Sequence, residues 1–348
     1  MKVRELECSH NAQQKIAGVR YTGTFSITNQ KNLLPVSFLN MALNLFLFAI
    51  LFTSVILNAT ACYVILLKVK KKEITHLFIT SISLTNMMES IVGFIPQVVT
   101  SNKLLLERTP LCISSGFAVF GCAVTSITHI TVLSFIRIIV IKYPFFYYKT
   151  CKKIWVKATL VAVCYLYGFS WATFPLIGWS KYELDLDKKR CSLDWKLTQS
   201  DSASYFLTIL IFCNILPAIV ISTTLYTSKK IISKRKARED FQNHHVSLDI
   251  LENDYLKVCL LSTATFFFIW TPYAVVGILT ILKIVIPTQL VTAGAMFAKL
   301  STITNVIINC FIVKSFKNQV LELRFIQYIR NIKKKISAVH PYHGSTMN

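Results

Sequence analysis

The sequence predicts an all-α membrane protein, a bundle of seven transmembrane helices followed by a short amphipathic helix. Three observations predict this fold. First, 53% of the 348 residues are hydrophobic and only 16% are charged, whereas about 25% of a typical soluble domain is charged. Second, seven apolar segments are each long enough to cross a lipid bilayer as a helix. Third, lysines and arginines gather in the short linkers between these segments.

The seven apolar segments follow one another with short connections. Polar backbone groups inside lipid must form hydrogen bonds within the segment that carries them, so each segment is predicted to be a helix and not a strand of an open sheet. In chain order the segments cover about residues 38–67, 75–99, 110–141, 154–178, 203–228, 255–282 and 285–313.

The charges of the linkers predict how the chain is oriented. Basic residues are concentrated after the first, third and fifth segments, whereas the linkers after the second and fourth segments are mixed in charge. The positive-inside rule then places the N-terminus outside the cell and the C-terminus in the cytoplasm. We expect residues 1–35 to form an extracellular tail, residues 36–313 the membrane domain, and residues 314–348 the amphipathic helix and a cytoplasmic tail.

The net charge of +22 does not predict nucleic-acid binding, because the basic residues lie in loops and tails and not on one continuous face. The predicted surrounding is the lipid bilayer. The ten cysteines show no metal-ligand spacing, and those inside apolar segments are expected to behave as small hydrophobic residues. No apolar run precedes Leu33, so no cleavable signal peptide is expected.

One charged residue, Lys299, lies near the middle of the apolar stretch Ile284–Val313. A lone ammonium at the centre of a bilayer costs about 2.5–3.5 kcal/mol on the insertion scale, and neither end of the stretch lets the side chain reach water easily. Three arrangements would offset this cost: a carboxylate partner, a water-filled cavity, or covalent chemistry that changes the amine.

Three short motifs accompany this lysine. The first segment contains Leu57-Asn58, the sixth contains Phe266-Phe267-Phe268-Ile269-Trp270-Thr271-Pro272-Tyr273, and the seventh contains Phe297-Ala298-Lys299 with Asn305 six residues later. Pro272 removes a helix hydrogen bond and kinks the helix, which turns Trp270 toward the bundle interior. With these residues the chain resembles the opsins, the retinal-binding branch of the rhodopsin-like G-protein-coupled receptors, over about residues 58–318.

The resemblance implies a light-sensing receptor and not an enzyme, located in the plasma membrane or a photoreceptor membrane. Retinal would be held as a Schiff base on Lys299, since an amine condenses with an aldehyde. Its isomerisation by light would open the inner face to a heterotrimeric G protein, and arrestin is a further implied partner. The implied disulfide joins Cys112 to Cys191, and the implied retinal pocket consists of Trp195, Phe266, Trp270, Tyr273 and Ala295.

A buried positive charge on the Lys299 nitrogen needs an anion, or the nitrogen loses its proton. Vertebrate visual opsins carry a glutamate three residues after the third-helix cysteine, and that position is Ser115 here. The chain therefore resembles the non-vertebrate-visual opsins. Two counterion candidates remain: Glu89, in the middle of the second segment, and Asp185, six residues before the second disulfide cysteine. Glu89 is favoured over Asp185.

Both candidates have another interpretation. Glu89 would be a protonated, hydrogen-bonded residue with a structural role. Asp185 would be a solvated loop residue, since it lies close to three basic residues, Lys188, Lys189 and Arg190.

The motifs at the inner face depart from the family. The usual acid-Arg-Tyr at the inner end of the third helix is Ile136-Arg137-Ile138, and the usual Asn-Pro-x-x-Tyr of the seventh is Asn305-Val306-Ile307-Ile308-Asn309. The expected activation switch consists of Arg137, Asn305 and Glu252 of the sixth segment. Because the arginine lacks its neighbouring acid, Glu252 is its expected partner across helices.

Two other functions remain open. A retinal photoisomerase would share Lys299, but it would release isomerised retinal and need not signal. A receptor for a diffusible ligand would pair Lys299 with Glu89 and never bind retinal.

Overall fold

The computed structural model describes residues 28–69, 74–100, 109–185, 190–239, 246–312, 314–323 and 327. The chain divides into two units, Met1–Phe46 and Leu47–Asn348, and the bundle described below belongs to the second. Helix α1 (Thr28–Tyr63) begins in the first unit. Its start lies inside the segment that the sequence assigned to the extracellular tail.

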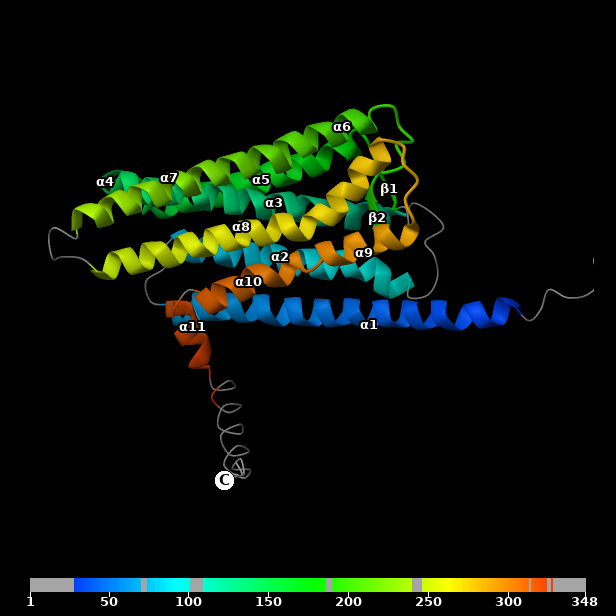
Figure 1. Ribbon diagram of the computed structural model, residues 1–348, viewed down its shortest axis with the longest axis horizontal. Coiled ribbons are helices and arrows are strands. Elements are labelled where there is room, and N and C mark those ends of the chain that lie inside the picture. Colours follow the sequence, from blue (N-terminus) through cyan, green and yellow to red (C-terminus); the bar gives the residue numbers. More distant parts are fainter. Residues whose placement is uncertain are drawn as a thin grey trace, which may run out of the picture. The chain divides into compact units, whose positions relative to one another are not determined.

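The predicted seven-helix bundle is present (Figure 1). Its membrane helices are α1, α2 (Ile74–Thr100), α3 (Pro110–Lys142), α5 (Ile154–Thr173), the run of α6 (Ser202–Ile209), η4 (Leu210–Ile215) and α7 (Leu216–Glu239), α8 (Val246–Ile281), and the pair α9 (Thr288–Ala298) and α10 (Ser301–Ile312). The shorter elements are η1 (Val64–Lys68), α4 (Pro144–Phe146), η2 (Tyr147–Cys151), η3 (Phe174–Leu176), β1 (Tyr182–Leu184), β2 (Cys191–Leu193) and α11 (Lys314–Leu321).

The outer surface of the bundle suits lipid. Among the described residues, six helices are long and apolar enough to cross a membrane, and the seventh, α2, packs against α3, α5 and α10. Large apolar side chains such as Phe135, Leu166 and Phe268 are exposed on the outside. Exposed apolar surface on this scale marks contact with a membrane, so the chain is an integral membrane protein.

Helix α3 is the centre of the bundle and contacts α2, α5, α7 and α8. Its first turn is capped by Thr109, whose side chain accepts a hydrogen bond from the backbone N–H of Cys112 at 3.2 Å. A Cβ on Gly168 of α5 would clash with the Thr125 side chain, and it would lie 2.9 Å from the carbonyl oxygen of Gly121. The close approach of α3 and α5 therefore requires a residue without a side chain.

A buried histidine joins α3 to α2. His129 is fully buried, with Nδ1 2.8 Å from the carbonyl oxygen of Thr125 and Nε2 2.9 Å from the hydroxyl of Ser81. A carbonyl only accepts, so Nδ1 donates to it, and Nε2 of the neutral ring accepts from Ser81. Both ring nitrogens are therefore used in packing the helices together, which is a structural role.

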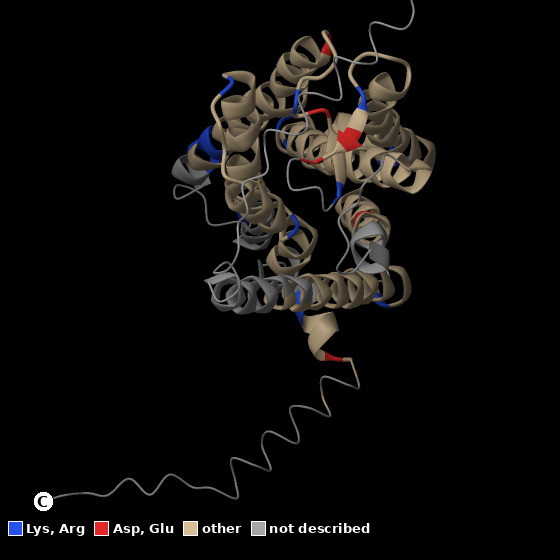
Figure 2. Cartoon of the chain, turned by 90° about the vertical axis from the view of Figure 1, so that its right-hand side faces the viewer, with Lys and Arg blue, Asp and Glu red and all other residues tan. Residues whose placement is uncertain are grey.

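Strands β1 and β2 form an antiparallel hairpin at the end of the bundle away from α11. Figure 2 views the bundle from this end, with the hairpin lying across the helices. The register pairs Tyr182 with Leu193 and Leu184 with Cys191. The fully buried Tyr182 donates a hydrogen bond to the carbonyl oxygen of Ala172 at 2.8 Å. Burial raises the pKa of Tyr182, so its phenol stays protonated and remains a donor.

The opposite end of the bundle carries α11, in the place of the predicted amphipathic helix (Figure 1). Val320 and Leu323 pack against the apolar cluster that contains Ala61 and Val64, whereas Lys317 is exposed. The amphipathic pattern of α11 and its surroundings thus agree with the sequence.

The seventh apolar segment differs from its prediction as one continuous helix. It forms two helices, α9 and α10, which are separated by Lys299 and Leu300. The break positions the site described next.

We predict that Gly168→Ala destabilises the folded bundle by about 1–3 kcal/mol, because the added methyl group overpacks the contact of α3 with α5. Thermal unfolding of the purified protein in detergent measures the effect. Gly294→Ala is the matched control, because a Cβ there would have its nearest neighbours at an ordinary 3.5 Å. Equal stability of the two variants would contradict the prediction.

Candidate functional site

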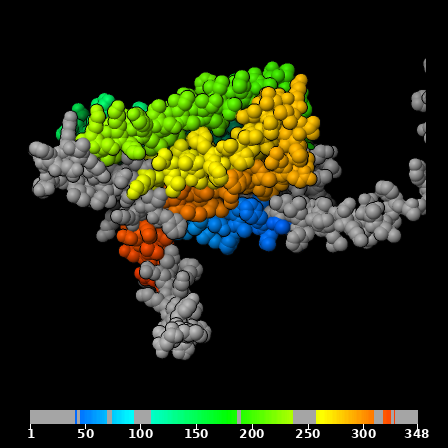
Figure 3. All heavy atoms as spheres, in the orientation of Figure 1, coloured from blue at the N-terminus to red at the C-terminus, as the bar shows by residue number. Residues whose placement is uncertain are grey.

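A cavity of about 180 Å³ lies inside the bundle, beneath the hairpin. On the face shown in Figure 3, the side chains of α8 and of the pair α9–α10 lie against one another and close the bundle. The wall is largely aromatic and aliphatic, and it includes two acid–base groups that the sequence had singled out, Glu89 and Lys299. All five residues expected in the pocket line this cavity: Trp195, Phe266, Trp270, Tyr273 and Ala295.

Lys299 lies at the break between α9 and α10. The hydroxyl of Ser301 donates to the carbonyl oxygen of Ala298 at 2.7 Å, and the hydroxyl of Thr302 donates to that of Lys299 at 2.9 Å. Serine and threonine side chains that bond to nearby carbonyls in this way compete with the backbone hydrogen bonds of a helix. The sequence Ser301-Thr302 directly after the lysine is therefore a local reason for the break.

Helix α1 forms a hydrogen bond to the backbone just after this break. The side-chain amide of Asn58 donates to the carbonyl oxygen of Thr302 at 2.9 Å and also to that of Ser54 at 2.8 Å. The side-chain oxygen Oδ1 of Asn58 accepts a hydrogen bond from the side-chain amide of Asn86 of α2 at 3.2 Å. Asn58 is fully buried, so these bonds form in a medium where they are strong. They tie α1 and α2 to the start of α10, just after Lys299.

The side chain of Lys299 points toward α2. Its Nζ lies 3.9 Å from the position that a Cβ on Gly93 would occupy. Glu89 lies one helical turn before Gly93 on the same helix, is only 6% exposed, and attracts Lys299 electrostatically. A buried carboxylate and the amine of a partly buried lysine thus line the same, otherwise mostly apolar cavity.

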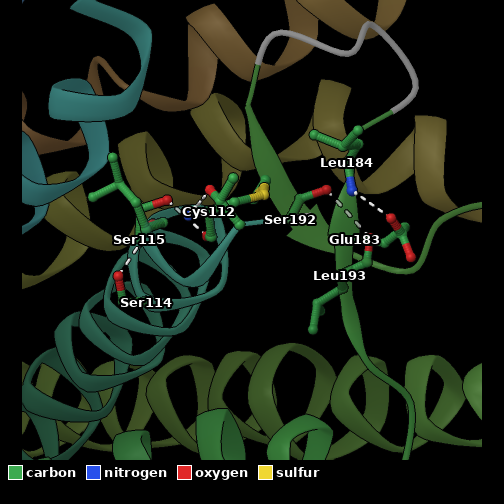
Figure 4. Close-up of a disulfide and its surroundings, with 10 residues drawn as sticks. Cys112, Ser114, Ser115, Glu183, Leu184, Ser192 and Leu193 are labelled. Atoms are coloured by element: carbon green, nitrogen blue, oxygen red, sulfur yellow. Dashed lines mark hydrogen bonds between the residues drawn. A yellow bond between two sulfur atoms is a disulfide. The ribbon is translucent and has the colours of Figure 1, made fainter. Parts of the chain in front are cut away.

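The hairpin is attached to α3 above this cavity. A disulfide joins Cys112 of α3 to Cys191 of β2 (Figure 4), which agrees with the expected pair. Ser115, in place of the usual glutamate, donates a hydrogen bond to the carbonyl oxygen of Cys112 at 2.9 Å. A Cβ on Gly116 would lie 2.9 Å from the Tyr182 ring, so this glycine lets the hairpin rest directly on α3.

Trp195 follows β2 and lies against α8. Its ring fills the space that a side chain on Gly277 would occupy, and it stacks on Phe206 with ring centroids 4.4 Å apart. Its indole N–H donates to the hydroxyl of Tyr273 at 2.8 Å. The hairpin and its continuation thus form a lid that is anchored to α3 by the disulfide and to α8 by this tryptophan.

Asp185 is fully buried, and its carboxylate oxygen Oδ2 lies 2.8 Å from Nε of Arg190. The hydroxyl of Tyr273 donates to the same oxygen at 3.4 Å. The interpretation of Asp185 as a solvated loop residue is therefore wrong. The burial of Asp185 could not be predicted from the sequence, because it depends on how the hairpin folds onto the helices.

The aromatic motif of α8 forms another part of the wall. The ring of Trp270 stacks on Phe266 with centroids 5.9 Å apart, and α8 continues through Pro272 with the bend visible in Figure 1. A ligand in the cavity would contact the Trp270 ring. This residue lies two positions before Pro272, where the helix lacks a backbone hydrogen bond donor.

Sequence reasoning missed the wall that η4 supplies. Pro217 has no N–H, so the carbonyl four residues earlier loses its helical donor, and a π-helical turn forms at this point. The side-chain amide of Asn214 donates to the carbonyl oxygen of Ile209 at 3.4 Å, and Tyr167 donates to that of Phe212 at 3.0 Å. The turn brings Cys213 and Asn214 to the cavity wall. A proline inside an apolar span was the available signal.

The expected activation switch lies at the far end of the bundle. Arg137 donates a hydrogen bond to the hydroxyl of Thr75 on α2 and interacts with Cys259 of α8. Arg235 of α7 donates to the carbonyl oxygen of Ile141, in the last turn of α3. Asn305 is buried in α10, and the side chain of Glu252 lies outside the described residues.

The comparisons with known proteins agree with this geometry. A family model described as 7 transmembrane receptor (rhodopsin family) matches residues 57–315. The chain is 27% identical to mouse Opsin-3, over 74% of this chain and 64% of that protein, and 29% identical to human Opsin-5, over 51% and 52%. It is 25% identical to the G0-coupled rhodopsin of Mizuhopecten yessoensis, over 71% and 63%.

These alignments span between about half and two thirds of the length of the curated relatives. Among solved structures, squid rhodopsin matches with a TM-score of 0.74 at 20% identity, covering 84% of this chain and 87% of that one. The structural match shows that the two proteins share a fold.

Proposed function

Because the chain belongs to the rhodopsin family of seven-transmembrane receptors, we propose that it is a light-sensing receptor that carries retinal on Lys299. The observation that supports the proposal most is the position of this amine, which lines a cavity inside the bundle together with Glu89. The relatives named opsin support the same function.

The residues around the cavity fit retinal in their chemistry. Covalent attachment of an aldehyde requires a primary amine, which Lys299 supplies. Most of the wall is apolar, as a polyene requires, and includes the rings of Trp195, Phe266 and Trp270. Bound retinal would supply the absorption of light and a light-driven change of shape.

Glu89 is the proposed anion for the positive charge on the Lys299 nitrogen. Its carboxylate lines the same cavity, whereas Asp185 does not line it and is bonded to Arg190. Neither charge of the Glu89–Lys299 pair is stable alone at this depth in a membrane, so each stabilises the charged form of the other.

The inner ends of the helices are the proposed G-protein surface, and arrestin is the proposed partner for shut-off. Pressure on Trp270 would move the part of α8 that lies on the inner side of the bend at Pro272. The contacts that must then change are those of Arg137 with Thr75 and Cys259 and that of Arg235 with α3. Such a receptor is a two-state device whose equilibrium the bound group shifts.

We expect the protein to form a pigment that absorbs in the visible or near-ultraviolet range when 11-cis retinal is added in the dark. Lys299→Ala removes the amine and should abolish the pigment, whereas Lys196→Ala, at an exposed lysine beside Trp195, should retain it. Absorption spectroscopy measures both. A wild-type protein that forms no pigment would favour a receptor for a diffusible ligand. Light-dependent release of retinal isomers without nucleotide exchange on a G protein would favour a photoisomerase.

We predict that Glu89→Gln shifts the pigment from visible toward near-ultraviolet absorption, because the Lys299 nitrogen loses its anion and with it the proton. The spectrum of the dark pigment provides the measurement. Glu183→Gln is the control, because this partly exposed lid glutamate is paired with Lys181. An unchanged spectrum for Glu89→Gln would remove Glu89 from the counterion role.

We predict that Arg235→Gln raises the light-independent rate of nucleotide exchange several-fold, because α7 loses its hydrogen bond to the last turn of α3. The rate is measured with purified receptor and G protein in the dark. Lys234→Gln changes an exposed neighbouring charge and should leave the rate unchanged. A basal rate that is equal in both variants would show that this contact does not hold the inner face closed.

A further inference from the structure

Two buried carboxylates lie close to the cavity, but their surroundings differ. Glu89 lines the cavity together with Lys299. Asp185 lies in the lid and is bonded to Arg190, which itself helps to form the cavity wall. The lid holds another buried acid, Asp194, which accepts hydrogen bonds from Ser202 and Thr198 and does not line the cavity.

The hairpin imposes the pairing of Asp185 with Arg190. Leu184 is paired with Cys191 in the register, so Asp185 and Arg190 are the next positions along the two strands. The N–H of Asp185 donates to the carbonyl oxygen of Arg190 at 2.9 Å, which continues the ladder by one step. Residues opposite each other in an antiparallel pair bring their side chains together, and here they have opposite charges.

The pair is shielded from solvent. The Asp185 side chain is 0% exposed and the Arg190 side chain 10% exposed, so salt and water screen the attraction little. Tyr273 connects the pair to the cavity wall, because its hydroxyl donates to Asp185 at 3.4 Å while accepting from Trp195 at 2.8 Å. Asp185 is therefore placed where a counterion could act, but its charge is already balanced.

We propose that Arg190 neutralises Asp185 toward the cavity and thereby leaves Glu89 as the anion for Lys299. This inference rests on the proposed function, because it concerns which carboxylate serves the Lys299 nitrogen when retinal is attached. Arg190 is a positioning residue in this role, since it acts through Asp185. The pair contributes no net charge to the cavity as long as both members are present.

Removing one member of the pair has a predictable electrical result. Asp185→Asn leaves the cation of Arg190 unbalanced in the cavity wall, and a positive charge on the nearby Lys299 nitrogen becomes less favourable. Arg190→Gln leaves Asp185 as an additional anion beside the cavity. The double variant removes both charges and should restore the electrical balance of the wild type.

The spectra of the dark pigments separate two roles for Asp185. If Arg190 neutralises it, Asp185→Asn shifts the pigment toward the near-ultraviolet range, and Asp185→Asn with Arg190→Gln returns it to the wild-type range. If Asp185 is itself the counterion, the double variant remains near-ultraviolet, and the proposal is overturned. Asp185→Asn with Lys181→Gln is the matched control, because it removes a different lid cation and should not restore the spectrum.

A second pair of variants tests the same inference from the side of Glu89. Glu89→Gln combined with Arg190→Gln should recover visible absorption, because Asp185 is then free to serve the Lys299 nitrogen. Arg190→Lys retains the charge and, combined with Glu89→Gln, should remain near-ultraviolet. If the variant that combines Glu89→Gln with Arg190→Gln still absorbs in the near-ultraviolet range, the proposal is contradicted.

The protein without retinal provides an independent measurement. Breaking a buried ion pair leaves an uncompensated charge, so Asp185→Asn and Arg190→Gln should each lower the Tm by several degrees, and the double variant should lower it by less than their sum. Additive losses would show that the two residues do not act as a pair. A wild-type protein that forms no pigment refutes the proposed function. The Tm values of the single and double variants would still decide whether Asp185 and Arg190 act as a pair.

Discussion

The bundle depends on one electrostatic constraint, which is the positive charge of Lys299 in the middle of a membrane segment. A lysine and a glutamate at this depth are each unfavourable alone, and together they stabilise each other. The chain meets the constraint by placing Glu89 of α2 and Lys299 on one cavity wall. The disulfide-anchored lid covers the cavity on the hairpin side.

The backbone just beyond the lysine is held by neighbouring helices. The carbonyl oxygen of Thr302, in the first turn of α10, accepts a hydrogen bond from the side-chain amide of Asn58 of α1. The side-chain oxygen of Asn58 in turn accepts one from Asn86 of α2. The proposed chromophore anchor is thereby fixed by three helices, and a change at Lys299 is mechanically connected to α1 and α2 as well as to α8.

Much of this could be predicted from the sequence, because the evidence was local. Apolar length and linker charge predicted seven helices, and the residues near Trp270 and Lys299 carried the family motif. The break at Lys299 was not predicted, because it arises from competition between the Ser301 and Thr302 hydroxyls and the backbone. The burial of Asp185 was not predicted either. A carboxylate within a basic stretch resembles a solvated residue until the hairpin register places Arg190 opposite it.

A signal that passes from the cavity to the inner end would travel along α8. At the cavity end, Trp270 of this helix lines the cavity together with Glu89 and Lys299. At the inner end, Cys259 of the same helix interacts with Arg137 of α3, which also donates a hydrogen bond to Thr75 of α2. Because Trp270 and Cys259 lie on one helix, a push on the tryptophan ring would reach the contact with Arg137 through the backbone of α8. The contact of Arg235 with the carbonyl oxygen of Ile141 joins α7 to α3 and does not involve α8, so a movement of α8 would act first on Arg137.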